Sequence, residues 1–146
     1  MKIADVHAHV FPEKLAVKAA GSIGQFYGTE MYCEASMERL VAEEEKAGVS
    51  RYVISSSAVV PKQVRSIVEF LAEARKGYPE CISFGSIYPG MDGYEEVLDE
   101  LQALGSRGLK IHPDFQKLPI DDPSGIETYR SIARRGLPVL MHMGDN

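Results

Sequence analysis

The stretch Asp5-Val6-His7-Ala8-His9 lies inside the first apolar run of the chain, which extends from Ile3 to Phe11. A strand points alternate residues to one face, so Asp5 and both histidines are expected on one face and the apolar residues on the other. Two imidazoles at this spacing can hold one metal ion, because histidine is the commonest nitrogen ligand for zinc and similar cations. The alternative is a pair of histidines packed at the end of a buried strand. Their shared face, directly before a Phe-Pro turn, favours the metal site.

The composition is that of one ordinary soluble domain. Of its 146 residues, 45% are hydrophobic and 25% charged, and the net charge is −5. Such a chain can bury a core, but it lacks the basic surface that nucleic acid or an anionic membrane would attract. No apolar run approaches a membrane span, and no signal segment opens the chain. Cys33 and Cys81 are too far apart in sequence to suggest a disulfide framework, so reduced thiols and a cytoplasmic location are expected.

Strand and helix patterns alternate along the sequence. Strands are expected at 3–10, 51–55, 81–88, 109–112 and 137–143. Helices are expected at 13–20, 37–47, 61–76, 94–104 and 122–135, the second of them with Ser36 as its N-cap and Gly48 as its C-cap. This alternation predicts an α/β fold, in which five parallel strands are joined by right-handed helical crossovers. No linker divides the sequence, so residues 1–146 are expected to form a single domain.

Two segments between these elements carry their own expectations. The acidic run Glu43-Glu44-Glu45 is expected to be a solvated helix face. Residues 21–32, with three glycines, predict a long loop over the end of the first strand. Its aromatic residues Phe26 and Tyr27 either line a substrate pocket or pack the loop onto the body of the domain.

The histidines share one location in the predicted fold, the carboxyl ends of strands, where active sites lie in parallel α/β proteins. They are His7 and His9 after the first strand, His112 after the fourth and His142 after the fifth. The alternation of side chains also turns Lys110 inward, on the face of His112. Asp145 follows the fifth strand, near the rim of the same site.

Three segments carry a resemblance to a known family. DVHAHVFPE at 5–13, GLKIHPDFQ at 108–116 and VLMHMGD at 139–145 resemble the metal-dependent amidohydrolase superfamily. The closest likeness is to its branch of small TIM-barrel hydrolases and aminocarboxymuconate-semialdehyde-type decarboxylases. The resemblance implies a (β/α) barrel with a divalent metal, usually zinc, at its C-terminal mouth. It also implies that His7, His9 and His142 are metal ligands.

The resemblance gives the remaining inward residues catalytic roles. Lys110 lies where some superfamily members carry a carboxylated lysine that bridges two metals. The branch resembled here usually has one metal, so Lys110 and His112 are expected to contact the substrate or to support the ligands, and Asp145 completes the catalytic set. Alternatively, an inward lysine needs an anionic partner, for which Asp5 and Asp114 are candidates.

The main departure from the family is the number of strands. The family barrel has eight, so this TIM-barrel-like domain is expected to be incomplete, with strands 6–8 absent. The family's strand 6 histidine and strand 8 aspartate are then absent too. Open edges on the first and fifth strands predict a homo-oligomer through these edges.

The expected function is that of a metal-dependent hydrolase, if the missing strands complete it. The resemblance implies that metal-activated water attacks an amide, ester or lactone of a small-molecule substrate, or that a related decarboxylation occurs. The alternative is an inactive truncated half-barrel that acts as an assembly or metal-binding module. A phosphatase-type metal barrel, which also begins with histidines, fits GLKIHP and MHMGD less well.

Overall fold

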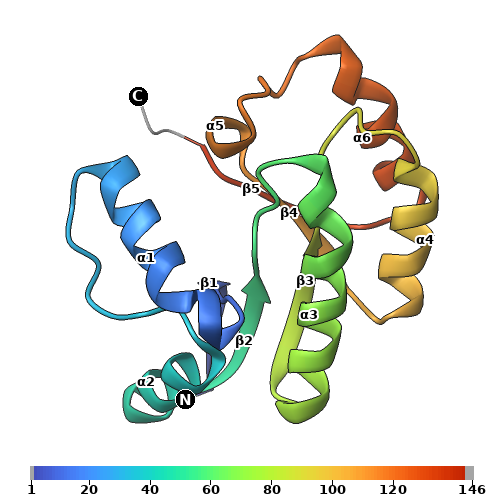
Figure 1. The fold of residues 1–146 in the computed structure, drawn as a ribbon. Coiled ribbons are helices and arrows are strands. Elements are labelled where there is room, and N and C mark those ends of the chain that lie inside the picture. Colours follow the sequence, from blue (N-terminus) through green and yellow to red (C-terminus); the bar gives the residue numbers. More distant parts are fainter. Residues whose placement is uncertain (1, 144–146) are drawn as a thin grey trace.

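The computed structural model describes residues 2–143, whose strands form one parallel sheet in the order β1-β2-β3-β4-β5. The sheet curls into a half-barrel, with the carboxyl ends of its strands at the top of Figure 1. The predicted partial (β/α) barrel is confirmed. The strands are β1 (Ile3–His9), β2 (Val49–Ser55), β3 (Cys81–Ser86), β4 (Gly108–Ile111) and β5 (Val139–Met141).

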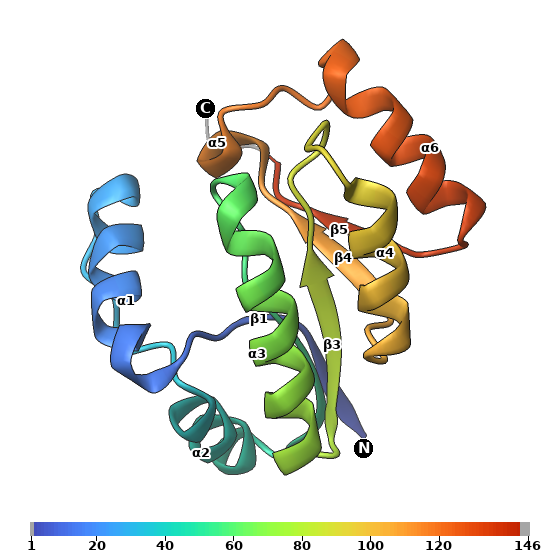
Figure 2. The same cartoon turned by 45° about the vertical axis from the view of Figure 1, so that its right-hand side comes forward.

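Helices α3, α4 and α6 lie side by side over one face of the sheet (Figure 2). α1 stands apart from this layer, and its C-terminal end lies toward α5. No helix within residues 2–143 is long and apolar enough to cross a membrane. The helices are α1 (Glu13–Tyr27), α2 (Met37–Ala47), α3 (Val64–Gly77), α4 (Tyr94–Ala103), α5 (Pro113–Gln116) and α6 (Ile126–Arg134), with 3-10 turns η1 (Pro61–Gln63) and η2 (Pro123–Gly125) before α3 and α6.

The core lies between the sheet and these helices. Leu109 and Ile111 of β4 are buried there against apolar side chains of α3, α4 and α6. Lys110 between them therefore faces the opposite, concave side, as the alternation predicts. Each large apolar side chain buried in this layer stabilises the fold by about 1.5–3 kcal/mol, so the core holds the inner residues of the strands in place.

Sequence signals located the ends of α2 correctly. The Ser36 side chain accepts a hydrogen bond from the backbone N–H of Arg39 (3.1 Å), and Gly48 ends the helix with a positive φ of 73°. Both are common cap chemistries, because they satisfy backbone groups that the helix leaves unpaired. The predicted loop at 21–32 is wrong in its first half, since α1 continues through Tyr27. The segment between the strand predicted at 109–112 and the helix predicted at 122–135 contains the short helix α5, which no pattern had predicted.

Asp5 is not on the face of the two histidines. Asp5 pairs with Tyr52 and Ala8 pairs with Ile54, so three steps along β1 match two along β2. This bulge shifts the alternation by one residue. It places Asp5 on the helix-covered face, with Tyr52 and Ile54, and leaves His7 and His9 on the concave face.

Asp5 contacts the acidic run of α2 as a result. Its carboxyl group hydrogen-bonds that of Glu44, which is buried, so the predicted solvated face is wrong at this residue. Burial, the hydrogen bond and the charge of Asp5 all raise the pKa of Glu44 above its ordinary value. The other Asp5 contact is local: its Oδ1 accepts from the backbone N–H of His7 (2.8 Å).

Replacing Glu44 by glutamine is expected to stabilise the fold at neutral pH. A raised carboxyl pKa means that the folded state favours the protonated form, so Glu44 weakens the fold as the pH rises past its folded pKa. Glu44→Gln keeps a hydrogen-bond donor for Asp5 and removes this penalty. We expect a rise in the melting temperature of roughly 2–5 °C at pH 7 and a smaller rise in acid. The control is Glu45→Gln, at the exposed neighbouring residue. An equal rise in the melting temperature of this variant would contradict the assignment of the effect to the buried carboxyl group of Glu44.

Candidate active site

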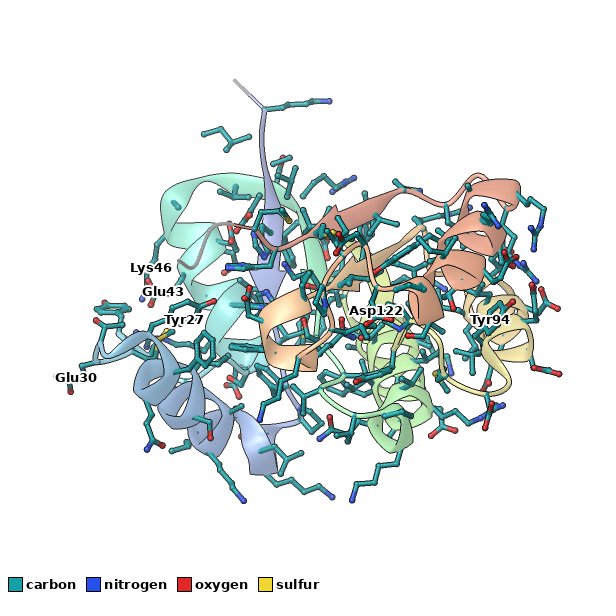
Figure 3. All side chains as sticks on the ribbon, turned by 90° about the horizontal axis from the view of Figure 1, so that it is seen from above. Tyr27, Glu30, Glu43, Lys46, Tyr94 and Asp122 are labelled. Atoms are coloured by element: carbon teal, nitrogen blue, oxygen red, sulfur yellow. The ribbon has the colours of Figure 1, made fainter. Side chains whose placement is uncertain are left out.

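The four histidines and Lys110 gather at the carboxyl ends of β1, β4 and β5. His7 and His9 are the last inward residues of β1, Lys110 is an inward residue of β4, and His112 and His142 directly follow β4 and β5. Figure 3 shows this end of the molecule from above. The structure therefore places these five predicted residues at one end of the sheet, where their contacts join them in two groups, His7 with His9 and Lys110, and His112 with His142.

One group of nitrogen atoms meets at His7. Its Nε2 lies 3.0 Å from Nε2 of His9 and 3.0 Å from Nζ of Lys110. The lysine ammonium has only donors, so the His7 nitrogen accepts from it. Lys110 is fully buried, whereas His7 is exposed. Of the two carboxylates considered as partners for Lys110, Asp5 lies on the other face of β1; the contact with His7 was not predicted.

A second group is built around Tyr27 at the end of α1. Its hydroxyl lies 3.2 Å from Nε2 of His112 and 3.3 Å from Nε2 of His142. The rings of Phe115, His112 and His142 are stacked in sequence, with centroid distances of 3.8 and 4.0 Å and nearly parallel planes. Phe26 meets Phe115 edge-on at 4.7 Å. Both aromatic residues of the predicted loop thus reach the site, but from a helix.

Gln116 fixes the segment that carries His112. It is buried, and its side-chain amide donates to the carbonyl oxygens of Ala58 (3.0 Å) and Ile87 (2.8 Å). Its Oε1 accepts from the backbone N–H of His112 (3.3 Å). These bonds tie α5 to the ends of neighbouring strands. Sequence reasoning missed Gln116, because nothing in its neighbourhood distinguishes it from a solvated glutamine.

The electrostatics of the site keep both β1 histidines neutral. Burial, then the charges of Lys110 and the other three histidines, lower the pKa of His9 to about 3. Burial and the charges of Lys110 and His142 also lower the pKa of His7, and Asp5 opposes this shift. These couplings show that the two groups of side chains share one electrostatic environment. Neutral imidazoles at pH 7 can bind a metal without first releasing a proton.

The donor set fits a metal ion in part. Two nitrogen atoms 3.0 Å apart, as in His7 and His9, can both lie about 2.0–2.1 Å from one zinc ion. Within residues 2–143, no three His, Cys, Asp or Glu side chains converge closely enough to form a complete site. The predicted third ligand, His142, has its Nε2 beside the Tyr27 hydroxyl instead. Asp145, predicted near the rim, lies outside the described residues.

The fold and the position of the site define a protein of the TIM-barrel class, with its polar residues at the C-terminal mouth. Residues 4–145 match the sequence profile of the amidohydrolase family, so the chain belongs to that family. The resemblance inferred from the three motifs is confirmed. No curated protein sequence shows significant similarity to the chain.

Solved structures show the same fold. The chain is 16% identical to 5-carboxyvanillate decarboxylase from Novosphingobium aromaticivorans, whose structure contains manganese and 3-methoxy-4-hydroxy-5-nitrobenzoic acid; 97% of this chain and 50% of that chain align, with a TM-score of 0.73. A protein described as a probable 2-pyrone-4,6-dicarboxylic acid hydrolase from Acinetobacter baumannii, with citric acid bound, is 17% identical over 98% of this chain and 50% of that chain, with a TM-score of 0.63. The chain thus spans about half the length of these structures.

A third solved structure is 2,6-dihydroxybenzoate decarboxylase with 2,6-dihydroxybenzoate. It is 16% identical to the chain, with a TM-score of 0.65, and 97% of this chain and 50% of that chain align. Hydrolases and decarboxylases therefore both share this half-barrel, and the fold by itself does not choose between the two reactions.

Proposed function

We propose that this chain provides the metal-binding half of an amidohydrolase-family enzyme that acts on a small carboxylated molecule by hydrolysis or decarboxylation. The observation that carries the proposal is the 3.0 Å approach of the His7 and His9 Nε2 atoms at the strand ends, in a chain whose family match runs from residue 4 to 145. His7, His9 and His142 are the proposed ligands of a divalent cation.

The cation would supply Lewis acidity to a substrate oxygen and lower the pKa of a water molecule. The similar proteins do not identify the ion. Zinc is usual in the branch of the superfamily that the sequence resembles, whereas one of the similar solved structures contains manganese. Imidazole nitrogen is an ordinary ligand of zinc, whereas manganese favours oxygen ligands, so a set of three histidines favours zinc.

The remaining residues act on the substrate in this proposal. Lys110 brings a buried positive charge beside His7, and His112 stands next to the stacked rings. Both can orient an anionic oxygen of a carboxylated substrate. This chemistry agrees with the acids named in the three solved structures. Asp145, which follows β5 in the sequence, is proposed as a further catalytic group.

The proposal is tested by equilibrium dialysis of the full chain against zinc and, separately, against manganese. We expect one bound ion per chain at neutral pH, released as the pH falls, because protons compete for the imidazoles. No binding of either ion, or binding that survives a His7→Ala substitution unchanged, would refute the assignment. The inactive assembly module is not favoured by the family match, and association through the open edges stays a prediction.

A further inference from the structure

Ser57, two residues after β2, carries a buried hydroxyl for which the described part of the chain offers no hydrogen-bond partner. Three other side chains within residues 2–143 contain such an atom. Arg39 and Arg75 belong to helices α2 and α3. Ser83 lies on the helix-covered face of β3, where it pairs with Ile54 of the core. Buried polar groups are nearly always hydrogen-bonded in folded proteins, so the hydroxyl of Ser57 needs an explanation.

The alternation of side chains along β2 turns Ser57 toward the concave side of the sheet. Ile54 and Ala58 are both buried in the core between the sheet and the helices. Ser55 instead pairs with His9, which lies on the concave face. Ser57 is two residues beyond Ser55 and therefore shares its face. This is the side of the sheet on which the candidate active site lies.

Hydrogen bonds fix the chain on both sides of Ser57. The hydroxyl of Ser56 donates to a backbone carbonyl oxygen just beyond β1. The backbone N–H of Ala58 donates to Oγ of Ser86 (2.8 Å), and its carbonyl oxygen accepts from the side-chain amide of Gln116 (3.0 Å). The two neighbours of Ser57 are thus bonded to segments at the ends of β1 and β3 and to α5. A hydroxyl held in this way is preorganised for a ligand.

A positive charge lies at the same level of the sheet. Ser55 pairs with Phe84, so Ser57 is level with Ser86, which is also two residues further along its strand. Ser86 in turn pairs with Lys110, which is fully buried. A hydroxyl donor and a buried ammonium group in one row suit an anionic oxygen, because hydrogen bonds to charged groups are stronger than those between neutral groups.

We propose that Ser57 is a substrate-binding residue, whose hydroxyl donates a hydrogen bond to a carboxylate oxygen of a small organic acid beside the positive charge of Lys110. The inference rests on the proposed function for the class of substrate. It extends the site from the ends of β1, β4 and β5 to the end of β2.

The stability of two alanine variants tests whether the hydroxyl is unpaired in the folded chain. Ser57→Ala removes a buried polar group and breaks no hydrogen bond within residues 2–143, so the melting temperature should stay equal or rise. Ser56→Ala is the matched control, because its hydroxyl is bonded, and its melting temperature should fall by roughly 2–4 °C. A similar fall in both variants would overturn the premise of the proposal.

Binding is tested with 2,6-dihydroxybenzoate, the ligand of one solved structure with this fold. The full chain is titrated with it, with and without zinc, and followed by NMR. Ser57→Ala should bind it roughly tenfold more weakly, because the hydrogen bond to a charged oxygen is lost. The same ring without the carboxylate, 1,3-dihydroxybenzene, should show no such difference between the two chains. Ser66→Ala, which alters an exposed hydroxyl, should bind 2,6-dihydroxybenzoate as the unmodified chain does.

Two results would overturn the proposed role of Ser57. One is equal affinity of Ser57→Ala and the unmodified chain for 2,6-dihydroxybenzoate, and the other is no saturable binding with or without zinc. A failure of the proposed function would differ from both, because zinc would then not bind or would bind independently of His7. The metal-free titration of Ser57→Ala would still decide whether the hydroxyl binds a carboxylate.

Discussion

His9→Ala is expected to lower the zinc affinity of the chain by roughly a hundredfold. Zinc sites built from four protein ligands bind with about 10–16 kcal/mol, so one ligand contributes roughly 3 kcal/mol. His9 should show the full loss, because its Nε2 already lies beside that of His7 and its low pKa keeps the ring neutral. Isothermal titration of zinc into the two chains at pH 7 measures the difference.

The control for this substitution comes from the same site. His112→Ala removes a histidine that is not a proposed ligand, and its affinity should stay within about threefold of the unmodified chain, a change of less than 1 kcal/mol. A similar loss in both variants would indicate that any change at the strand ends disrupts binding. A loss in His112→Ala alone would replace His9 by His112 in the ligand set.

Mild acid is expected to destabilise the folded chain through His9. The pKa of His9 in the folded chain is about 3, below the ordinary value of 6.5. Between these two values, His9 is protonated in the unfolded chain but not in the folded chain. The free energy of unfolding should therefore fall as the pH drops below 6.5, by about 1.4 kcal/mol per pH unit at most. His7 adds to the fall in the same direction, less strongly because it is exposed.

Urea denaturation of the metal-free chain between about pH 6.5 and 5 isolates this effect, because most carboxylates titrate below that range. His9→Gln has no group to protonate and should show a markedly flatter dependence on pH. If His9→Gln loses stability in acid as steeply as the unmodified chain, the ring of His9 is not the source.

The sheet order and the place of the site could be predicted, because both follow from local patterns. Alternating strands and helices lead to a parallel sheet, and the carboxyl ends of its strands bring His7, His112 and His142 together. Lys110 turned inward because β4 is regular. Asp5 does not face inward, because β1 contains a bulge between Asp5 and Ala8. The bulge depends on how β1 pairs with β2, and the sequence of β1 alone does not reveal it.

The length of α1 was missed for a similar reason. Glycines are unfavourable in helices by about 1 kcal/mol each relative to alanine, so the glycines after Ala20 suggested a loop. In the structure Gly24 packs so closely that a Cβ would lie 2.6 Å from the carbonyl oxygen of Thr29. A residue with a side chain would not fit at this position of the helix, because the following loop is too close. The longer helix brings Tyr27 to the site.

The details of the site depend on distances that sequence does not contain. The partner of Glu44 is Asp5, and the partners of Tyr27 are two histidines, 85 and 115 residues away. Motif matching identified the histidines as a set but could not say which of them already converge. Here His7 and His9 converge, and the His142 ring lies against the His112 ring and near the Tyr27 hydroxyl.

X-ray absorption spectroscopy of the zinc-loaded full chain tests the central claim most directly. If His7, His9 and His142 hold the ion, the spectrum should contain imidazole nitrogen atoms at about 2.0–2.1 Å, and their number should fall in His7→Ala and in His9→Ala. A first shell of oxygen atoms only, or a spectrum unchanged by both substitutions, would contradict a metal site at these strand ends.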